Sequence, residues 1–449
     1  MQQSEPHPMS YQDVLAYLYK QLPMYHRIGK AAYKADLTNT LQLMELLGHP
    51  EKKIKCIHVA GTNGKGSASH MLASVLQSAG YKTGLYTSPH LLDFRERIRI
   101  NGEMIPEELV VDFVHTYRTD FEKINLSFFE WTVGLCFAYF AEQEIDIAII
   151  ETGLGGRLDS TNVVTPLVSV ITNIALDHTD LLGETIPLIA REKAGIVKNT
   201  IPFVIGERSH ETDTVFLEKA ARERSKITFA EDSFQVSCSN IPKDGFCDYH
   251  ISPLRSGAAF SVRSPLTGQY QIQNLTTVLE TLRVLSDKGF VADINAIKQG
   301  IESVCRLTGL MGRWQTLDHS PLTIADTGHN LHGINRVVES IQSCRFNKLH
   351  VVLGFVAGKQ CKEAMEAFPL HASFYLTKPS VDRALPLDDL APIARELELN
   401  FSIYPDVEEA WLAAKKAASP EDMIFIGGST FVVADALALK QKSAISLHS

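Results

Sequence analysis

The chain has 449 residues, of which 45% are hydrophobic, and its formal net charge at pH 7 is −9. This length predicts two or three domains with ordinary hydrophobic cores. Because the net charge is negative and the basic residues are dispersed, no nucleic-acid partner is expected. No stretch approaches the roughly 20 apolar residues of a membrane span, and the N-terminus lacks a signal-peptide pattern, so we expect neither secretion nor anchoring. The seven cysteines lack CxxC spacing, which favours reduced thiols and a cytoplasmic location.

A glycine-rich loop follows the first predicted strand, Cys56–Ala60. Residues 60–67 read AGTNGKGS, and helical periodicity begins directly afterwards. Backbone amides, a helix N-terminus and a lysine are suited to bind phosphates, and the residues expected to do so are Gly61, Thr62, Asn63, Gly64, Lys65, Gly66 and Ser67. The loop departs from the pattern GxxxxGK[ST], because Val59 replaces the first glycine and Gly66 separates the lysine from the hydroxyl. Ordinary kinases and switch GTPases are therefore disfavoured, and a turn that binds nothing is the alternative.

Strand-like and helix-like stretches alternate after this loop, which predicts an α/β fold with a doubly wound, mainly parallel sheet. Further strands are expected at Thr83–Tyr86, Asp146–Glu151, Val168–Asn173 and Pro202–Gly206. Helical spacing is found at Val110–Lys123, Thr132–Glu142 and Ile186–Val197. Short polar pieces from Phe234 to Thr267 predict a small antiparallel excursion, followed by helices at Gln273–Lys288 and Ile294–Val304.

A second, smaller α/β series occupies the C-terminal part of the chain. Its strands are expected at Leu322–Ala325, Lys348–Gly354, Ser373–Leu376, Phe401–Tyr404 and Met423–Gly427. The preceding stretch has two glycines and no periodicity, as a linker would. The sequence thus predicts a phosphate-binding domain at residues 1–304, a linker at 305–312 and a C-terminal Rossmann-like α/β domain at 313–449.

Polar side chains follow several predicted strands. Glu151 ends one strand, and Ser88 and His178 follow two others. Because open α/β sheets bind ligands at the carboxyl edge of their strands, we expect these residues to lie near the glycine loop. Glu151 is a candidate magnesium ligand, since Mg²⁺ prefers oxygen donors and needs few of them from the protein. A turn or capping role is the alternative for each residue.

Two other stretches carry candidate side chains. Lys193 lies within a half-apolar predicted helix, where most lysines are solvated surface residues. Asp326 and His329 follow a strand of the second sheet, in a loop that precedes a helix. An interdomain ligand site is one interpretation of this loop, and helix capping is the other.

Seven motifs taken together resemble the folylpolyglutamate synthase/dihydrofolate synthase family, which belongs to the Mur-type ATP-dependent amide ligases. In chain order they read AGTNGKGS, TSPH, ETGLGGRLDSTN, LDHTDLLG, EKAGIVK, GRW and DTGHN. The resemblance covers nearly the whole chain and is closest to the bifunctional bacterial type. It implies that the γ-phosphate of ATP activates a carboxylate and that the amine of glutamate then attacks the acyl phosphate.

The resemblance also assigns roles to individual residues. It implies that the glycine loop binds the triphosphate and that further nucleotide contacts come from Asn274, Arg313, Asp326 and His329. It implies two Mg²⁺ sites, one held by Ser88 and Glu151 and a second that His178 helps to form. Lys65, Glu151, His178 and Lys193 are the implied catalytic residues, and Lys193 matches a lysine that is carbamylated in the family. The implied pteroate-binding residues are Ser127, Phe128, Phe129, Glu130, Leu158, Asp159 and Ser160.

The implied partners are small molecules, namely dihydropteroate or folates together with L-glutamate, bound to a monomeric protein without a nucleic-acid or membrane partner. One alternative is folylpolyglutamate synthase activity alone. A kinase and a non-catalytic nucleotide-binding protein are alternatives of other classes. The chain departs from the family at residues 358–360, where Gly–Lys–Gln replaces a DKD-like triplet, so the binding of glutamate or the closure of the domains is expected to differ there.

Overall fold

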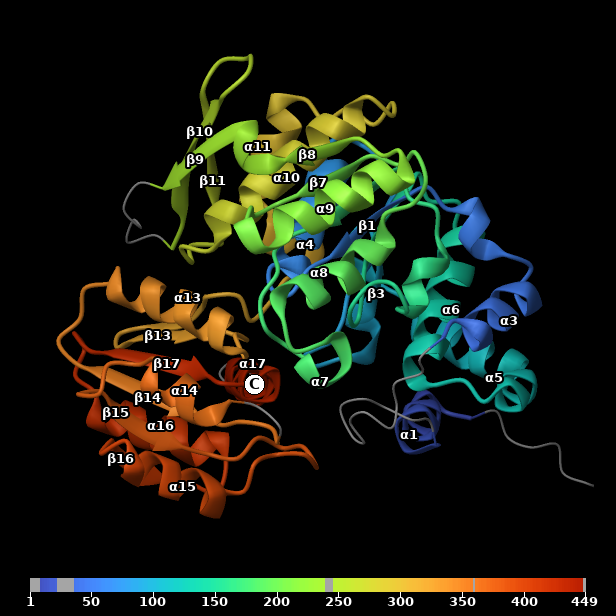
Figure 1. Cartoon of the computed structure of the whole chain (residues 1–449). Coiled ribbons are helices and arrows are strands. Elements are labelled where there is room, and N and C mark those ends of the chain that lie inside the picture. Colours follow the sequence, from blue (N-terminus) through green and yellow to red (C-terminus); the bar gives the residue numbers. More distant parts are fainter. Residues whose placement is uncertain (1–8, 22–35, 239–244, 358–359, 447–449) are drawn as a thin grey trace, which may run out of the picture. The chain divides into compact units, whose positions relative to one another are not determined.

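The structure, a computed structural model, describes residues 9–21, 36–238, 245–357 and 360–446 (Figure 1). These residues form two compact units. Unit 1 comprises the described residues up to Ile174 together with His178–Asp232 and Thr277–Gly300, and unit 2 comprises Ala175–Asp177 and the described residues within 233–276 and 301–446. Gly358 and Lys359 of the departing triplet lie outside the described residues. The predicted α/β class with two sheets is confirmed.

Unit 1 is built on an eight-stranded sheet with the order β4-β3-β2-β5-β1-β6-β7-β8. Five neighbouring pairs are parallel, from β2 to β8, and β3 and β4 add an antiparallel edge. The strands are β1 (Cys56–Ala60), β2 (Thr83–Tyr86), β3 (Ile98–Ile100), β4 (Glu103–Met104), β5 (Ile147–Glu151), β6 (Val168–Ile171), β7 (Phe203–Ile205) and β8 (Ile227–Phe229). The sequence predicted the five central strands and missed β3, β4 and β8.

The helices of unit 1 all carry buried apolar residues. They are α1 (Tyr11–Gln21), α3 (Thr38–Leu46), α4 (Lys65–Ser78), α5 (Glu107–Ile124), α6 (Phe128–Glu142), α7 (Thr179–Leu182), α8 (Ile186–Lys193) and α9 (His210–Glu223), with short 3₁₀ turns η2 (Pro50–Lys53), η3 (Phe94–Arg97), η4 (Ser160–Val163), η5 (Ala194–Ile196) and η6 (Ala230–Asp232). One core joins α1, α3, α5 and α6 to β2, β3 and β5 and contains the buried pair Phe121 and Trp131, whose ring centroids are 4.4 Å apart. A second core lies between β6, β7, α8 and α9. These cores hold the strand ends in fixed positions.

Unit 2 contains a six-stranded sheet with the order β12-β13-β17-β14-β15-β16, in which only β12 is antiparallel. Its strands are β12 (Gln315–His319), β13 (Leu322–Ala325), β14 (Leu349–Leu353), β15 (Ser373–Leu376), β16 (Asn400–Ile403) and β17 (Met423–Gly427). Its helices are α12 (Val304–Thr308), α13 (Leu331–Gln342), α14 (Cys361–Glu366), α15 (Leu387–Glu396), α16 (Val407–Ala417) and α17 (Thr430–Ser446). Helices α10 (Gln271–Ser286) and α11 (Ile294–Glu302) each continue from one unit into the other.

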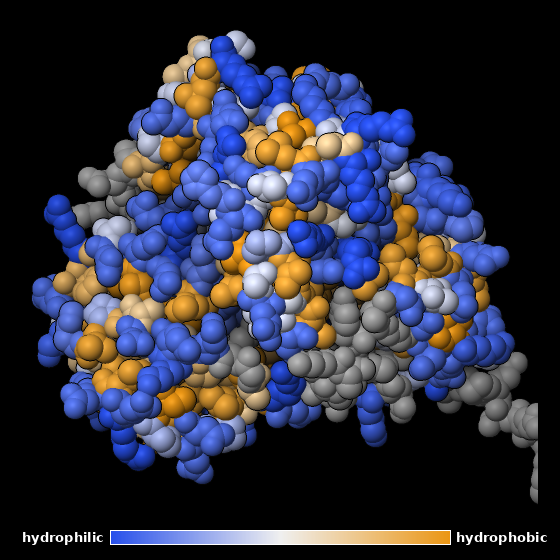
Figure 2. All heavy atoms as spheres, in the orientation of Figure 1, coloured by the Kyte–Doolittle hydropathy of each residue, from blue (hydrophilic) through white to orange (hydrophobic). Residues whose placement is uncertain are grey.

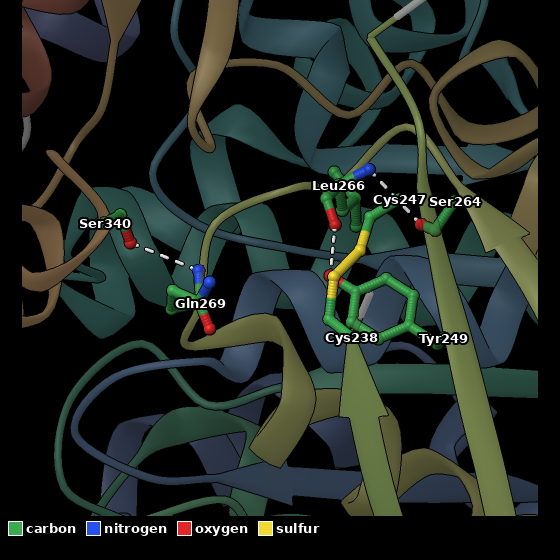
Figure 3. Close-up of a disulfide and its surroundings, with 7 residues drawn as sticks. All are labelled: Cys238, Cys247, Tyr249, Ser264, Leu266, Gln269 and Ser340. Atoms are coloured by element: carbon green, nitrogen blue, oxygen red, sulfur yellow. Dashed lines mark hydrogen bonds between the residues drawn. A yellow bond between two sulfur atoms is a disulfide. The ribbon is translucent and has the colours of Figure 1, made fainter. Parts of the chain in front are cut away.

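The predicted antiparallel excursion is confirmed as a three-stranded sheet in unit 2, formed by β9 (Phe234–Cys238), β10 (Cys247–Pro253) and β11 (Phe260–Ser264). A disulfide joins Cys238 and Cys247 across the β9–β10 pair (Figure 3). The prediction of reduced thiols is therefore wrong for these two residues, because antiparallel pairing brings their Cα atoms to 6.5 Å. The other five cysteines, which all lie in the described part of the chain, form no disulfide.

On the face that Figure 2 shows, hydrophilic residues are interspersed with hydrophobic ones. Isolated exposed apolar residues of this kind are normal for globular proteins. Among the helices that the structure describes, none is both long and apolar enough to cross a bilayer.

Candidate active site

Three neighbouring strands of unit 1 end at the same edge of the sheet. Strand β1 lies between β5 and β6, and Val59 is in register with Glu151 on one side and Val170 on the other. Backbone hydrogen bonds continue past the strand ends. Thr152 N donates to Val59 O, and Thr172 N donates to Ala60 O, both at 2.9 Å. The prediction that the glycine loop, Glu151 and the segment after β6 start from one edge is confirmed.

The glycine loop is held by residues that follow β6. Thr62 N donates to Asn173 O, and Asn63 N donates to Asn173 Oδ1, both at 2.9 Å. The hydroxyl of Thr172 donates to Asn63 O at 2.6 Å. Gly61 has a φ of +150°, and a Cβ built there would lie 1.9 Å from the Thr172 hydroxyl oxygen, so only glycine fits. Thr172 and Asn173 were not predicted as site residues, because the predicted strand Val168–Asn173 included them, whereas β6 ends at Ile171.

Two lysines converge on one carbonyl of this loop. Lys65 Nζ donates to Gly61 O at 3.0 Å and to Thr62 O at 3.1 Å, while Lys193 Nζ donates to Gly61 O at 2.7 Å. Lys193 is the last residue of α8 and is only 4% exposed. The alternative of a solvated surface lysine is therefore wrong. Two ammonium groups so close to each other repel, and an anion placed beside them would relieve that repulsion.

Glu151 contacts the loop that follows β2. The backbone N–H of Ser88 donates to Glu151 Oε2 at 3.2 Å, and Glu151 is buried. Ser88 and Glu151 are therefore neighbours in the folded chain, and each has a side-chain oxygen atom that can bind a metal ion. This is a set that Mg²⁺ accepts, since it takes few protein ligands and completes its shell with water and phosphate oxygens.

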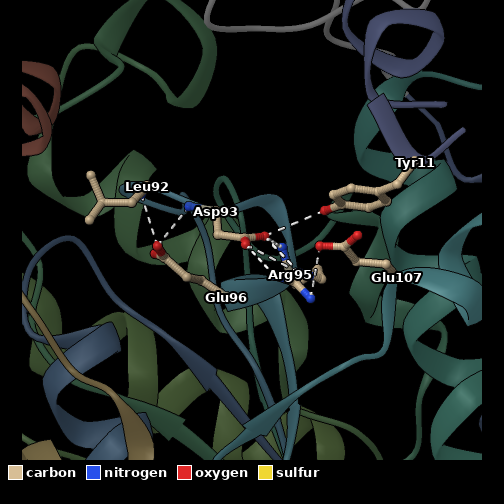
Figure 4. A network of polar contacts seen from close by, with 6 residues as sticks. All are labelled: Tyr11, Leu92, Asp93, Arg95, Glu96 and Glu107. Atoms are coloured by element: carbon tan, nitrogen blue, oxygen red, sulfur yellow. Dashed lines mark hydrogen bonds and ion pairs between the residues drawn. The ribbon is translucent and has the colours of Figure 1, made fainter. Parts of the chain in front are cut away.

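A network of carboxylates fixes the loop that carries Ser88 (Figure 4). Glu96 accepts the backbone N–H groups of the three residues from Leu91 to Asp93, each at 2.8 Å. Asp93 in turn accepts three hydrogen bonds from the Arg95 side chain, and Arg95 also pairs with Glu107 at 3.2 Å. These contacts hold the loop in the conformation that the structure shows.

His178 begins α7 with a φ of 49°, in the left-handed region that few non-glycine residues adopt. Its side chain is partly exposed. Within the described ranges of the chain, no group of three or more His, Cys, Asp and Glu side chains is arranged to hold a metal. Any metal here would need oxygen atoms from a ligand as well.

The GLGGRLDSTN stretch is organised around Asp159, which is buried. Asp159 Oδ2 accepts the N–H groups of Gly153 at 2.9 Å and Leu154 at 2.8 Å. Its Oδ1 accepts from Thr161 N at 3.0 Å and from Thr161 Oγ1 at 2.5 Å. Burial raises the pKa of Asp159 above its ordinary value, against these hydrogen bonds. The carboxylate holds the loop after Glu151 in place.

A buried histidine extends this network beneath the loop. His58 Nε2 lies 2.9 Å from Thr161 Oγ1, and burial lowers the pKa of His58 to about 3. The histidine is therefore neutral. Leu158 and Ser160 flank Asp159 and are partly exposed.

The predicted pteroate-binding residues at the start of α6 have different surroundings. Ser127 and Glu130 form a capping box, in which the serine hydroxyl accepts Glu130 N at 3.3 Å and the glutamate accepts Ser127 N at 2.7 Å. Phe128 is a core residue with the Arg97 guanidinium over its ring. Phe129 is partly exposed, and its ring packs against Gly153, where a Cβ would lie 2.5 Å away. Of the two phenylalanines, Phe129 has the face that a flat ligand can reach.

Unit 2 carries a second cluster, centred on Asp326 at the carboxyl end of β13. Asp326 is 3% exposed and accepts three hydrogen bonds, from Tyr270 Oη at 2.5 Å, Trp314 N at 2.7 Å and Gly328 N at 2.8 Å. Arg313 precedes Trp314 and donates to the hydroxyl of Thr327. Tyr270 was not predicted as a site residue, because it lies in none of the motifs.

The other predicted nucleotide contacts of unit 2 lie near this cluster or on α10. His329 is partly exposed, and its Nδ1 lies 3.0 Å from Thr327 O. Asn274 is buried on α10 and donates to Gln271 Oε1 at 2.9 Å. Asn330 caps α13 by accepting Gly333 N at 2.8 Å, which confirms a capping role for the end of the DTGHN motif.

Comparison with protein families places two models on this chain. The Mur ligase middle domain matches residues 59–282, and the Mur ligase glutamate ligase domain matches residues 312–430. Among curated proteins, the folylpolyglutamate synthase of Lacticaseibacillus casei is 33% identical over 94% of this chain and 97% of its own length. The dihydrofolate synthase/folylpolyglutamate synthase of Bacillus subtilis is 32% identical over 95% of this chain and 98% of its own length.

Solved structures show the same likeness. Escherichia coli FolC in complex with DHPP and ADP superposes with a TM-score of 0.85 at 28% identity, covering 98% of this chain and all of that one. Mycobacterium tuberculosis folylpolyglutamate synthase complexed with ADP gives a TM-score of 0.83 at 29% identity, covering 96% and 98% of the two chains. With these relatives and the arrangement of the glycine loop beside Glu151, the chain belongs to the folylpolyglutamate synthase/dihydrofolate synthase family of Mur-type ATP-dependent ligases.

Proposed function

We propose that this protein joins L-glutamate to dihydropteroate, and also to the glutamyl chain of tetrahydrofolate, through an acyl phosphate formed with ATP. The observation that carries the proposal is the convergence of Lys65 and Lys193 on the glycine loop, at the edge where β5 delivers Glu151. Such a site suits the charge that develops during phosphoryl transfer. The names of the B. subtilis relative and the ligands of the E. coli structure support both the reaction and its substrates.

The loop Gly61–Ser67 binds the triphosphate in this proposal, with Lys65 on its negative charge. The remaining nucleotide contacts come from Asn274, Arg313, Asp326 and His329. Lys65 leaves its present carbonyl acceptors when phosphate oxygens become available, because a charged acceptor forms the stronger hydrogen bond.

We assign the magnesium sites to Ser88 and Glu151, with His178 contributing to a second ion. The adjacency of the Ser88 and Glu151 oxygen donors supports this assignment. When bound, Mg²⁺ neutralises charge on the transferring phosphoryl group. The role of Glu151 in this chain is to hold the ion beside the loop.

We further propose that Lys193 is carbamylated in the active enzyme. In this step the neutral amine bonds to the carbon of CO₂ and releases a proton, which converts the side chain to an anion. The present surroundings support the change, because Lys65 and Lys193 share the Gly61 carbonyl and carbamylation would replace a like-charge contact with an opposite-charge one.

The pteroate ring system is proposed to lie on Phe129, beside the loop that Asp159 holds. Ser127, Phe128 and Glu130 support this site through the capping box and the core rather than by direct contact, and Leu158 and Ser160 line the partly exposed side of the loop. Dihydropteroate and tetrahydrofolate both carry the pterin ring, so this site suits both substrates of a bifunctional enzyme.

The test is to incubate the protein with ATP, Mg²⁺ and glutamate, first with dihydropteroate and then with tetrahydrofolate, and to measure products by mass spectrometry. We expect one added glutamyl residue in the first reaction and one or more in the second. One molecule of ADP should form for each glutamyl residue added. A product with tetrahydrofolate alone would show folylpolyglutamate synthase activity only. A stable phosphorylated product would show a kinase, and nucleotide binding without any turnover would show a non-catalytic protein.

The domain boundaries at residues 304 and 312, the monomeric state and the cytoplasmic location belong to the same proposal. Limited proteolysis and light scattering test the first two. Fractionation of cells that produce the protein tests the third.

A further inference from the structure

We propose that Tyr270 is a positioning residue for nucleotide binding, because its hydroxyl fixes the orientation of the Asp326 carboxylate. The inference rests on the proposed role of Asp326 as a nucleotide contact. No motif in the sequence marks Tyr270, and its place in the mechanism follows only from its contact with Asp326.

The carboxylate of Asp326 is held from three directions. Oδ2 accepts from both Tyr270 Oη and Trp314 N, and Oδ1 accepts from Gly328 N. A carboxylate has about four acceptor positions, so one position on Oδ1 is left for a further donor. A ribose hydroxyl group is a donor of the required kind. Tyr270 therefore determines which oxygen faces a nucleotide.

The segment that precedes Tyr270 is held by hydrogen bonds of Leu266 and Gln269 (Figure 3). The hydroxyl of Tyr249, on β10, donates to Leu266 O at 2.6 Å, and Leu266 N donates to Ser264 Oγ at 3.2 Å. Three residues later, Gln269 N donates to Ser340 Oγ on α13 at 3.1 Å. The backbone is thus tied to the small sheet at one end and to α13 at the other, immediately before residue 270.

Packing restricts the ring as well. A Cβ built on Gly268 would lie 2.7 Å from Tyr270 Cε1 and 3.2 Å from Trp314 Cβ. The glycine is therefore required for the ring to lie against its own chain. Fixed backbone and fixed ring together leave the hydroxyl little freedom, which is what a positioning group needs.

The hydroxyl also controls the charge of Asp326. Burial raises the pKa of Asp326, whereas the hydrogen bond from Tyr270, the Arg313 charge and the amides of Gly328 and Trp314 lower it. The pKa of Tyr270 is itself raised well above its ordinary value by burial and by Asp326, so the hydroxyl stays protonated and remains a donor. Without the Tyr270 hydroxyl, the pKa of Asp326 is higher, so the carboxylate takes up a proton at a higher pH. The oxygen that carries the proton then no longer accepts a hydrogen bond from the nucleotide.

The test compares Tyr270→Phe with the wild-type protein by calorimetric titration of ADP and by ligase kinetics, between pH 5.5 and 9. We expect the dissociation constant of ADP and the KM for ATP to rise about tenfold at pH 6 and less at pH 9, with kcat within about twofold. Tyr375→Phe is the matched control, because it removes a buried hydroxyl that contacts His350 at 3.0 Å in the same unit. Tyr375→Phe should change neither the dissociation constant of ADP nor the KM for ATP.

A second variant keeps the test decisive if Tyr270→Phe folds poorly. The carboxamide in Asp326→Asn cannot titrate, so the ratio of the ADP affinities of Asp326→Asn and of the double variant that adds Tyr270→Phe should not change with pH across the acid range. The double variant should bind ADP no more weakly than Asp326→Asn alone, because both changes act on one contact. Unchanged ADP affinity in folded Tyr270→Phe, or additive losses in the double variant, would overturn the inference. Absence of ligation in the wild-type protein would refute the proposed function but leave the ADP comparison valid.

Discussion

The substitution Asp159→Asn tests how the loop after Glu151 is held. The carboxylate accepts four hydrogen bonds, two from Gly153 and Leu154 and two from Thr161. A carboxamide keeps one acceptor oxygen and turns an NH₂ group toward two donors, so two of the four bonds are lost. At about 1.5–3 kcal/mol for each bond to a charged group, the loss is about 3–6 kcal/mol.

Part of this loss is offset, because a neutral amide is easier to bury and burial already raises the pKa of Asp159. We therefore expect a net destabilisation of about 3 kcal/mol, which corresponds to a fall of roughly 6–12 °C in Tm for a domain of this size. Differential scanning fluorimetry at pH 7.5 measures it. Asp287→Asn is the control, since it makes the same chemical change on an exposed carboxylate. A Tm for Asp159→Asn equal to that of the control would refute the structural role assigned to the carboxylate.

The other predictions concern single groups of the two units. Glu151→Gln should lower ligase turnover by roughly 100-fold or more without changing Tm, and normal turnover at low Mg²⁺ would contradict its role as a metal ligand. Lys193→Ala should be nearly inactive and should regain turnover with added acetate, whereas an active variant would exclude the carbamate. Replacing Cys238 and Cys247 with serine should cost about 2–3 kcal/mol of unfolding free energy, measured in urea under non-reducing conditions, because the disulfide closes a short loop. Stability should fall as pH drops from about 6.5 toward 3, because His58 is neutral when folded and gains a proton when unfolded; an equal fall in His58→Gln would show that other groups cause it.

Much of the fold was predictable because the central strands are continuous apolar runs that are buried on both faces. Strands β1 and β2 have the bounds that the sequence predicts, and the alignment of Glu151 with the glycine loop follows from parallel pairing. The strands β3, β4, β8 and β12 were missed, because short strands and antiparallel pairs near the edges of a sheet leave little periodic signal.

The site residues were predictable by type but not by contact. From the sequence, Lys193 was either a surface lysine or, by resemblance to the family, a functional residue. Only the folded structure shows that its Nζ donates to the Gly61 carbonyl. Asp159 and Tyr270 owe their roles to hydrogen bonds with residues that lie elsewhere in the folded chain or adopt a particular turn. The disulfide was hidden for a similar reason, since its cysteines become neighbours only when β9 and β10 pair.

Transfer of oxygen from the carboxylate substrate to phosphate tests the central claim most directly. The tetrahydrofolate substrate is labelled with ¹⁸O in its glutamyl carboxylates and incubated with ATP, Mg²⁺ and glutamate, and the released phosphate is analysed by mass spectrometry. Activation at the edge formed by β5, β1 and β6 predicts one ¹⁸O atom in each phosphate for each amide bond formed. Unlabelled phosphate would show that water, not the carboxylate, attacks ATP, and would contradict the account.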